Sequence, residues 1–194
     1  MVQLTPPFRA ATAADSQVLA EFVNYASEGM ALYLWTKSAA GGDAWEVGRQ
    51  RARRETGGFS YRNAVVLEQQ GRVVAGMVGY LLPAHPEPIP PDMPAMFVPL
   101  QELENLAPGT WYVNVLAAIP GERGKGHGAA LLGVADRLAT AAGARALSII
   151  VSEANIGARR LYERCGYREL ARRPKVKNGW QGEGREWVLL IKQT

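Results

Sequence analysis

Two helices are predicted near the amino terminus from the spacing of apolar side chains. Thr12 and Asp15 form a typical helix start, because an acid three residues after a threonine can satisfy unpaired backbone N–H groups. Apolar residues follow at helical spacing, namely Val18, Leu19, Phe22 and Val23. We therefore expect a first helix over residues 13–28 and a second over residues 44–55, capped by Asp43. An aromatic stretch, residues 33–35, lies between them.

The pattern then changes to runs of β-branched and aliphatic residues, which are typical of strands. Residues 63–70 and 73–82 are expected to form two strands joined by a tight turn at Gly71. The remaining elements are expected to alternate: a strand over 111–118, a helix over 126–142, a strand over 146–152, a short helix over 156–165, and strands over 167–174 and 186–192. This order predicts an α/β fold with a mixed sheet.

Residues 83–109 differ from the rest of the chain in composition. They hold eight of the twelve prolines and four acids but no lysine or arginine. This proline density excludes regular structure over most of the segment, although residues 100–106 can form a turn or two of helix. A connection of this length between paired strands is usually a functional lid or a disordered segment.

The composition of the chain limits the classes of protein to which it can belong. The chain has 194 residues, of which 47% are hydrophobic and 21% charged, as expected for one globular domain over residues 1–194. No run approaches the roughly 20 apolar residues of a membrane helix, and the amino terminus lacks the pattern of a signal peptide. Cys165 is the only cysteine, and the two histidines lie far apart, so neither a disulfide nor a zinc site is expected. We expect a cytoplasmic protein that binds no metal and no membrane.

The net charge is +4 and the isoelectric point is near 9.4. Nucleic-acid binding is not expected, because no basic run is interleaved with aromatic residues. An enzyme with an anionic ligand explains the positive charge equally well.

A glycine-rich loop, Arg123-Gly-Lys-Gly-His-Gly128, lies between a predicted strand and a predicted helix. Unpaired N–H groups and the helix dipole favour an anion at such a place. The loop does not fit the Walker A pattern, because Lys125 is followed by Gly126 rather than serine or threonine. A dinucleotide fingerprint fits only loosely, since residues 119–123 separate the glycines from the strand and no acid closes the next strand.

A third pattern, Arg/Gln-x-x-Gly-x-Gly/Ala, is satisfied by Arg123, Gly126 and Gly128. The run over residues 116–128 resembles motif A of the GCN5-related N-acetyltransferase (GNAT) superfamily. A second run, Asn155-Ile-Gly-Ala-Arg-Arg-Leu-Tyr-Glu-Arg-Cys-Gly-Tyr167, is similar to a later motif of the same superfamily. The two motifs stand in the expected order, so the resemblance is specific over about residues 112–167.

The resemblance implies a single GNAT-like domain with a mixed, mostly antiparallel sheet, a splayed parallel strand pair, flanking helices and the insertion 83–109. It implies acetyl-CoA as co-substrate and a small-molecule or peptide amine as acceptor, with a homodimer also compatible. The residues expected to bind the coenzyme are Leu116, Ala117 and Ala118 through their main chain, the loop residues Arg123, Gly124, Lys125, Gly126, His127 and Gly128, and Asn155 and Arg159. Asn155 can also serve as a helix cap.

The expected chemistry is direct attack of a neutral amine on the thioester. Tyr162 is the predicted general acid, since a phenol with a pKa near 10 stays protonated at neutral pH and can donate to a departing thiolate. Glu104 and Glu102 are the candidate general bases, because both precede the core strand on the insertion, and Glu153 is expected to be structural. For an α-amine with a pKa near 8, a chain of water molecules can suffice instead. The acid-only insertion is expected to attract a cationic amine. A module that binds acyl-CoA without catalysis is the alternative to an enzyme.

Overall fold

The structure is a computed structural model that describes residues 2–194. Within them the chain forms two compact units. The first unit holds the residues up to Tyr80 together with residues 114–131, and the second holds residues 81–113 and 132–194. Two elements contribute several residues to each unit, namely β4 (Trp111–Ala118) and α5 (His127–Ala141).

The strands follow the order β1-β2-β3-β4-β5-β7-β6. In the first unit, β2 (Ala64–Gln69) pairs antiparallel with both β1 (Phe8–Ala10) and β3 (Arg72–Leu81). In the second unit, β7 (Glu186–Gln193) pairs antiparallel with both β5 (Ala146–Ser152) and β6 (Arg168–Pro174). Residues 111–113 of β4 pair parallel with residues 147–149 of β5, and β4 then continues to Ala118. The predicted α/β class, with a mixed, mostly antiparallel sheet and one parallel pair, is confirmed.

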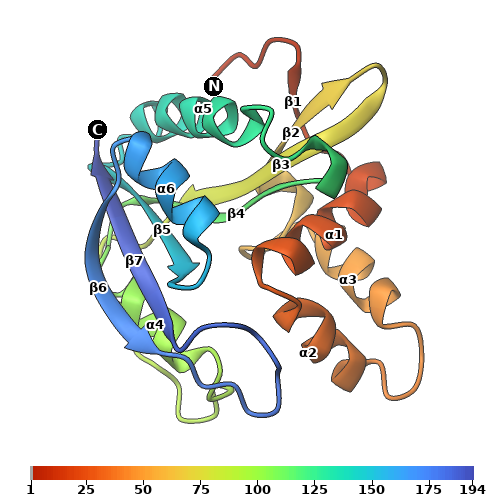
Figure 1. Ribbon diagram of the computed structural model, residues 1–194, viewed down its shortest axis with the longest axis vertical. Coiled ribbons are helices and arrows are strands. Elements are labelled where there is room, and N and C mark those ends of the chain that lie inside the picture. Colours follow the sequence, from red (N-terminus) through yellow and green to blue (C-terminus); the bar gives the residue numbers. More distant parts are fainter. Residues whose placement is uncertain (1) are drawn as a thin grey trace. The chain divides into compact units, whose positions relative to one another are not determined.

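The helices of the first unit precede its hairpin in the chain (Figure 1). They are η1 (Ala13–Asp15), α1 (Ser16–Ala26), α2 (Met30–Ser38), α3 (Ala44–Ala52) and η2 (Tyr61–Asn63). The predicted starts of the first and second helices are confirmed: the Thr12 N–H donates to Asp15 at 2.7 Å, and the Asp43 side chain accepts from the Trp45 N–H at 2.9 Å. Both helices end earlier than predicted. The aromatic stretch between them, residues 33–35, lies in α2, which was not predicted.

The hairpin between β2 and β3 turns through Gln70 and Gly71, whose φ angles are 52° and 73°. Positive φ at both central residues is the requirement of the tight turn predicted at this place. On β3, Gly76 allows the close approach of α1, because a Cβ there would lie 2.7 Å from the Phe22 ring. The aromatic residues of α2 and α3 pack beside this core: Trp35 is buried, 5.9 Å from the Trp45 ring and 6.4 Å from the Phe59 ring.

The second unit is built on β5, β7 and β6. Its core includes Leu147, Ile149, Val188, Leu189 and Leu190, all nearly inaccessible to solvent. The insertion contributes α4 (Val98–Glu104), which packs against β6 and β7 (Figure 1), so this part of it is an ordered helix. This unit also holds α6 (Ile156–Arg164) and the part of α5 from residue 132 on.

The connection between β6 and β7 is held by a cluster of aromatic and charged side chains. The Trp180 and Trp187 rings stack with centroids 6.0 Å apart, and Lys175 Nζ lies 4.2 Å from the Trp187 centroid. Lys175 Nζ also donates to Ser152 Oγ at 2.6 Å. Across residues 2–194, no helix combines the length and the apolar character needed to span a membrane.

Candidate coenzyme loop and catalytic residues

The glycine-rich loop joins β4 to α5 in the first unit. After Ala118 the chain makes the short helix η3 (Pro120–Glu122), and α5 begins at His127. Gly124 and Gly126 have φ angles of 78° and 86°, in a region that residues with a Cβ rarely adopt. The backbone of the loop therefore requires both glycines, and no atom outside the neighbouring residues lies within 4 Å of where either Cβ would be.

The amino terminus of α5 supplies N–H groups to this loop. The Gly126 carbonyl accepts from the Ala130 N–H at 3.1 Å, which makes Gly126 the residue before the first helical turn. The first N–H groups of a helix have no partner within the helix, and its dipole adds partial positive charge. This end of α5 can therefore bind an anionic group, as the sequence predicted.

The charges around the loop include an acid that the sequence interpretation did not use. Glu122 pairs with Lys125 at 2.8 Å and with Arg72 at 3.3 Å, and its Oε2 lies 3.5 Å from the His127 imidazole. The hydrogen bond from Lys125 holds the pKa of Glu122 below its usual value. Lys125 is thus partly neutralised before any ligand binds, so the backbone amides carry more of the expected binding than its charge does.

Arg123 and the end of β4 are connected through the main chain. Arg123 Nε donates to the Ala118 carbonyl at 3.4 Å, and its guanidinium lies 5.5 Å from the Tyr25 ring centroid. Leu116, Ala117 and Ala118 are half-buried. Small and apolar side chains at these positions leave the backbone as the main polar feature of this strand end.

The later motif forms the start and the buried face of α6 in the second unit. Asn155 Oδ1 accepts the Ala158 N–H at 3.1 Å, so this residue does cap the helix, while its Nδ2 has no hydrogen bond within residues 2–194. Arg159 pairs with Glu169 at 3.2 Å. The Arg159 charge is therefore already used inside the second unit.

Tyr162 lies on the buried face of α6. Its side chain is 6% exposed, and its ring centroid is 6.1 Å from that of Tyr167. Burial raises the pKa of Tyr162 well above that of a free phenol. The hydroxyl is therefore protonated throughout the neutral range, as the acid role requires.

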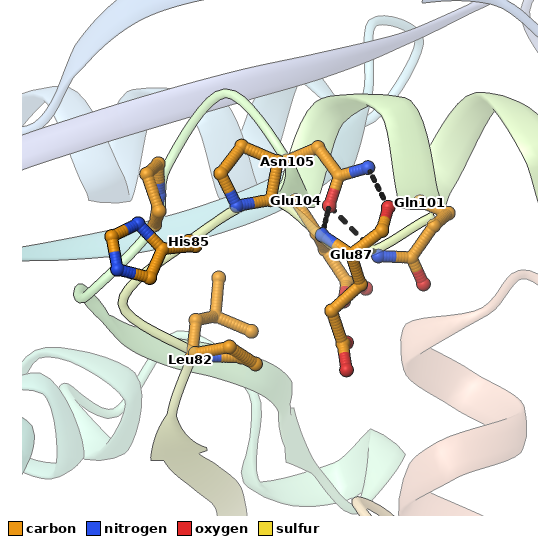
Figure 2. A pocket seen from close by; sticks show the side chains of 9 residues that line it. Leu82, His85, Glu87, Gln101, Glu104 and Asn105 are labelled. Carbon is orange, nitrogen blue, oxygen red and sulfur yellow. Dashed lines mark hydrogen bonds between the residues drawn. The ribbon is translucent and has the colours of Figure 1, made fainter. Parts of the chain in front are cut away.

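Glu104 lines a pocket that is formed entirely by the second unit (Figure 2). The hollow measures about 200 Å³, part of it open to solvent, and it is lined by Leu82, Pro83, His85, Pro86, Glu87, Gln101, Glu104, Asn105 and Pro108. Burial, assisted by the charge of Glu87, raises the pKa of Glu104 to about 7. No hydrogen bond or ion pair to the Glu104 carboxyl is found within residues 2–194. A half-buried carboxyl with this pKa can accept a proton near neutral pH.

Asn105 fixes one wall of this pocket. Its Oδ1 accepts the Glu87 N–H at 2.9 Å and its Nδ2 donates to the Glu87 carbonyl at 2.8 Å, while Gln101 Nε2 donates to the same Oδ1 at 3.2 Å (Figure 2). These bonds hold the proline-rich segment against α4. They therefore fix the backbone of Glu87, a residue to which the sequence interpretation had given no catalytic role.

The two other acids considered from the sequence have structural partners. Glu102 pairs with Arg173 at 2.6 Å. Glu153 accepts the backbone N–H groups of Arg185 and Glu186, each at 2.7 Å, and so fastens the connection between β6 and β7. Within residues 2–194, no three of the histidine, cysteine and acidic side chains gather as a metal ion would need.

The strand order and the loop before α5 define an acyltransferase fold. The family model for the acetyltransferase (GNAT) family matches residues 30–167. The chain belongs to this family, and it is an acetyl-CoA-dependent N-acetyltransferase. No curated protein sequence matches the chain significantly.

Solved structures with the same fold include enzymes of low sequence identity. One crystal structure of an acetyltransferase is 24% identical, covers 96% of this chain and 98% of its own, and has a TM-score of 0.66. An N-acetyltransferase from Staphylococcus aureus Mu50 is 15% identical and has a TM-score of 0.62. The match covers 95% of this chain and 98% of the Staphylococcus aureus chain. A GNAT family acetyltransferase from Elizabethkingia anophelis, solved with acetyl-CoA bound, is 16% identical and has a TM-score of 0.50. The match covers 68% of this chain and 75% of the Elizabethkingia anophelis chain. These likenesses establish the fold.

Proposed function

We propose that this enzyme transfers the acetyl group of acetyl-CoA to a primary amine of a small molecule or peptide, and that residues 1–194 act as one catalytic domain. The observation that carries the proposal is the loop before α5, where Gly124 and Gly126 adopt positive φ and leave the backbone open to a ligand. The loop amides from Arg123 to Gly128 bind the pyrophosphate of the coenzyme. Hydrogen bonds to a charged acceptor contribute about 1.5 to 3 kcal/mol each, so a few of them give useful affinity.

The rest of the coenzyme is assigned to the strand end and to α6. The main chain of Leu116, Ala117 and Ala118 binds the pantetheine arm, and Asn155 Nδ2, which the cap does not use, donates to a pantetheine carbonyl. Arg159 is the weakest of these assignments, because Glu169 already neutralises it. The acetyl-CoA-bound relative from Elizabethkingia anophelis supports the choice of coenzyme.

The reaction is a direct transfer in which the atoms balance without a metal or an acetyl-enzyme. The amine nitrogen bonds to the thioester carbon, the carbon–sulfur bond breaks, Glu104 takes one proton from the amine, and Tyr162 gives one proton to the thiolate. The proton on Glu104 then returns to the Tyr162 phenolate through water, which restores the enzyme. The raised pKa of Tyr162 keeps the hydroxyl protonated until the sulfur leaves. A thiolate that leaves into an apolar environment also has a raised pKa, which keeps the transfer feasible.

The test is release of free thiol from acetyl-CoA in the presence of amino acids, polyamines, aminoglycosides or peptides. We expect at least one of these classes to raise the rate about 100-fold above the rate without amine, as positioned acid and base groups do. Micromolar binding of acetyl-CoA without thiol release from any class would instead identify a coenzyme-binding module that lacks catalysis.

A further inference from the structure

Asn114 is exposed although it lies in the middle of a central strand. Its neighbours Val113 and Val115 on β4 are 0% and 4% exposed, and the Asn114 side chain is open to solvent. Asparagine is depleted in strands because it gains little from packing on a pleated surface. A solvent-facing amide at this position therefore calls for a reason other than stability.

The Asn114 amide is held in one orientation by Tyr80 of β3. Asn114 Nδ2 donates to the Tyr80 hydroxyl at 2.8 Å, so the nitrogen end of the amide is engaged. Its Oδ1 has no hydrogen bond within residues 2–194. The carbonyl end is thus a hydrogen-bond acceptor that is fixed in direction and open to a ligand.

Tyr80 is itself fixed by the backbone before η2. A Cβ on Gly58 would lie 2.7 Å from the Tyr80 hydroxyl oxygen, so only glycine allows the ring to rest there. Asn63 Nδ2 donates to the Gly57 and Gly58 carbonyls at 3.0 and 3.1 Å, which holds that backbone in place. Gly58, Tyr80 and Asn114 therefore form a supported chain of contacts that ends at the Asn114 carbonyl.

The position of Asn114 on β4 puts its side-chain carbonyl on the strand that is proposed to bind the acetyl donor, acetyl-CoA. Side chains two residues apart in a strand share a face and are about 7 Å apart along it, so Asn114 shares a face with Leu116 and Ala118. The proposed function assigns the main chain of those two residues to the pantetheine arm. An amine bound to Asn114 Oδ1 would thus lie on the same face of β4 as the Leu116 end of that arm, about 7 Å along the strand.

We propose that Asn114 orients the acceptor amine, and that Tyr80 is a positioning residue that aims the Asn114 amide. This inference rests on the proposed function. Asn114 Oδ1 accepts one N–H of the amine, which turns the nitrogen lone pair toward the carbonyl carbon. A neutral amide cannot take up the proton, so Asn114 does not replace the general base. Because the bond to Asn114 Oδ1 needs an N–H of the amine, the site favours acceptor amines that keep an N–H for it.

The experiment measures steady-state kinetics with spermidine, kanamycin and the peptide Ala-Gly-Ser-Glu, and carries the fastest of these acceptors through all variants. Asn114→Leu keeps the size of the side chain but removes the acceptor, and should raise the KM of the amine about tenfold, the cost of one hydrogen bond to a polar partner. Asn114→Asp keeps an oxygen acceptor that the Tyr80 hydroxyl can support. It should bring the KM of the amine back to within about threefold of wild type.

Two further variants test the support of Asn114. Tyr80→Phe removes the hydroxyl, and Gly58→Ala displaces the end of the Tyr80 ring, so both should raise the KM of the amine about threefold while leaving the KM of acetyl-CoA unchanged. Gly133→Ala, on an open face of α5 where a Cβ meets nothing within 4 Å, is the matched control and should change neither KM.

The outcomes separate this inference from the proposed function. If the wild type turns over and Asn114→Leu leaves the KM of the amine unchanged, or if it raises both KM values equally, the role of Asn114 is overturned and the acetyl transfer stands. If the wild type binds acetyl-CoA but releases no thiol with any of the three acceptors, the proposed function fails and this inference fails with it.

Discussion

Tyr162 and Tyr167 lie close together in the second unit, with ring centroids 6.1 Å apart, and they differ slightly in exposure. Burial raises the pKa of both, so both are protonated near neutral pH. The Tyr167 hydroxyl is fully buried and has no hydrogen-bond partner within residues 2–194. Tyr162 keeps 6% of its surface exposed, whereas Tyr167 is 0% exposed. Two neighbouring phenols therefore offer a pair of matched substitutions.

Tyr162→Phe should lower kcat about 100-fold and leave acetyl-CoA binding nearly unchanged, because only the proton donated to the leaving thiolate is removed. Tyr167→Phe is the control: it removes a hydroxyl from the same cluster, and it should leave kcat unchanged. Both kcat values come from thiol release at saturating acetyl-CoA. An unaltered kcat in Tyr162→Phe would remove Tyr162 from the acid role.

Glu104 should give the rate an ascending pH dependence. A general base works when it is deprotonated, and the pKa of Glu104 lies at about 7 because of burial and of Glu87. We expect kcat/KM to rise with pH through about 7, and Glu104→Gln to lower it about 100-fold and abolish this limb. Glu87→Gln should move the limb to lower pH, since it removes the repelling charge. Asp92→Asn, an exposed acid of the same insertion, should leave the profile unchanged.

The same shift has a consequence for stability. The folded state holds the Glu104 proton more tightly than the unfolded state, so stability from this group is present below pH 4.5 and is lost as the pH rises through about 7. Glu104→Gln should therefore raise the melting temperature at pH 8 and have little effect at pH 4. Equal melting temperatures of the two proteins at both pH values would contradict the assigned pKa.

At the scale of elements, Asn155 combines two roles that substitution can separate. Its Oδ1 caps α6, and its Nδ2 is proposed to bind pantetheine. Asn155→Asp keeps the capping oxygen and should preserve stability, but it should weaken acetyl-CoA binding about tenfold because a donor is lost. Asn155→Ala should also lose about 1 kcal/mol of stability.

The control for the helix cap is Asp43→Ala, which removes the cap of α3. It should lose a similar amount of stability, about 1 kcal/mol, without changing the affinity for acetyl-CoA. Stability is measured by urea unfolding and affinity by calorimetric titration. If Asn155→Asp binds acetyl-CoA as tightly as the wild type, Asn155 is a cap and nothing more.

Elements with strong local signals could be predicted from the sequence, and those that depend on distant partners could not. The hairpin at Gly71 and strand β4 follow from turn chemistry and apolar runs, and both were predicted correctly. Helix α2 was missed because its residues 30–35 are mostly apolar, without a periodic pattern, and become a helix through packing of Trp35 on α3 and Phe59. Strand β1 was missed because its three residues are ordered mainly by pairing with β2.

In the candidate site too, features with local sequence signals could be predicted and features that depend on distant residues could not. The glycine-rich loop and the start of α6 are local in sequence, so motifs could identify them. The pocket at Glu104 depends on hydrogen bonds between Asn105 and the backbone of Glu87, 18 residues away. No sequence spacing predicts such a contact. The Asn114 contact with Tyr80 joins residues 34 apart and was missed for the same reason.

At the scale of the whole molecule, binding of acetyl-CoA should stabilise the fold. A ligand at 100 times its Kd that binds only the folded state stabilises it by about 2.7 kcal/mol. For a chain of this size that raises Tm by roughly 5 to 10 °C. Gly126→Val should abolish this shift, because valine disfavours the φ of 86° at that position.

The matched control is Gly143→Val, which has a φ of 67° at the other end of α5 and equally open surroundings. It carries the same backbone strain and should lower Tm by itself, yet it should keep the full shift with acetyl-CoA. Thermal unfolding with and without the coenzyme measures both effects. A retained shift in Gly126→Val would overturn the assignment of the loop.

The five tryptophans are divided between the two units: Trp35 and Trp45 belong to the first, and Trp111, Trp180 and Trp187 to the second. In each unit two indoles lie in ring contact, Trp35 with Trp45 and Trp180 with Trp187; Trp45 is half-buried and the other three are buried. Indole emission shifts to the red when water reaches the ring. With Trp111 also replaced by phenylalanine, replacing one pair would leave the other pair as the optical reporter of its own unit, and the two variants would show whether both units melt in a single cooperative step.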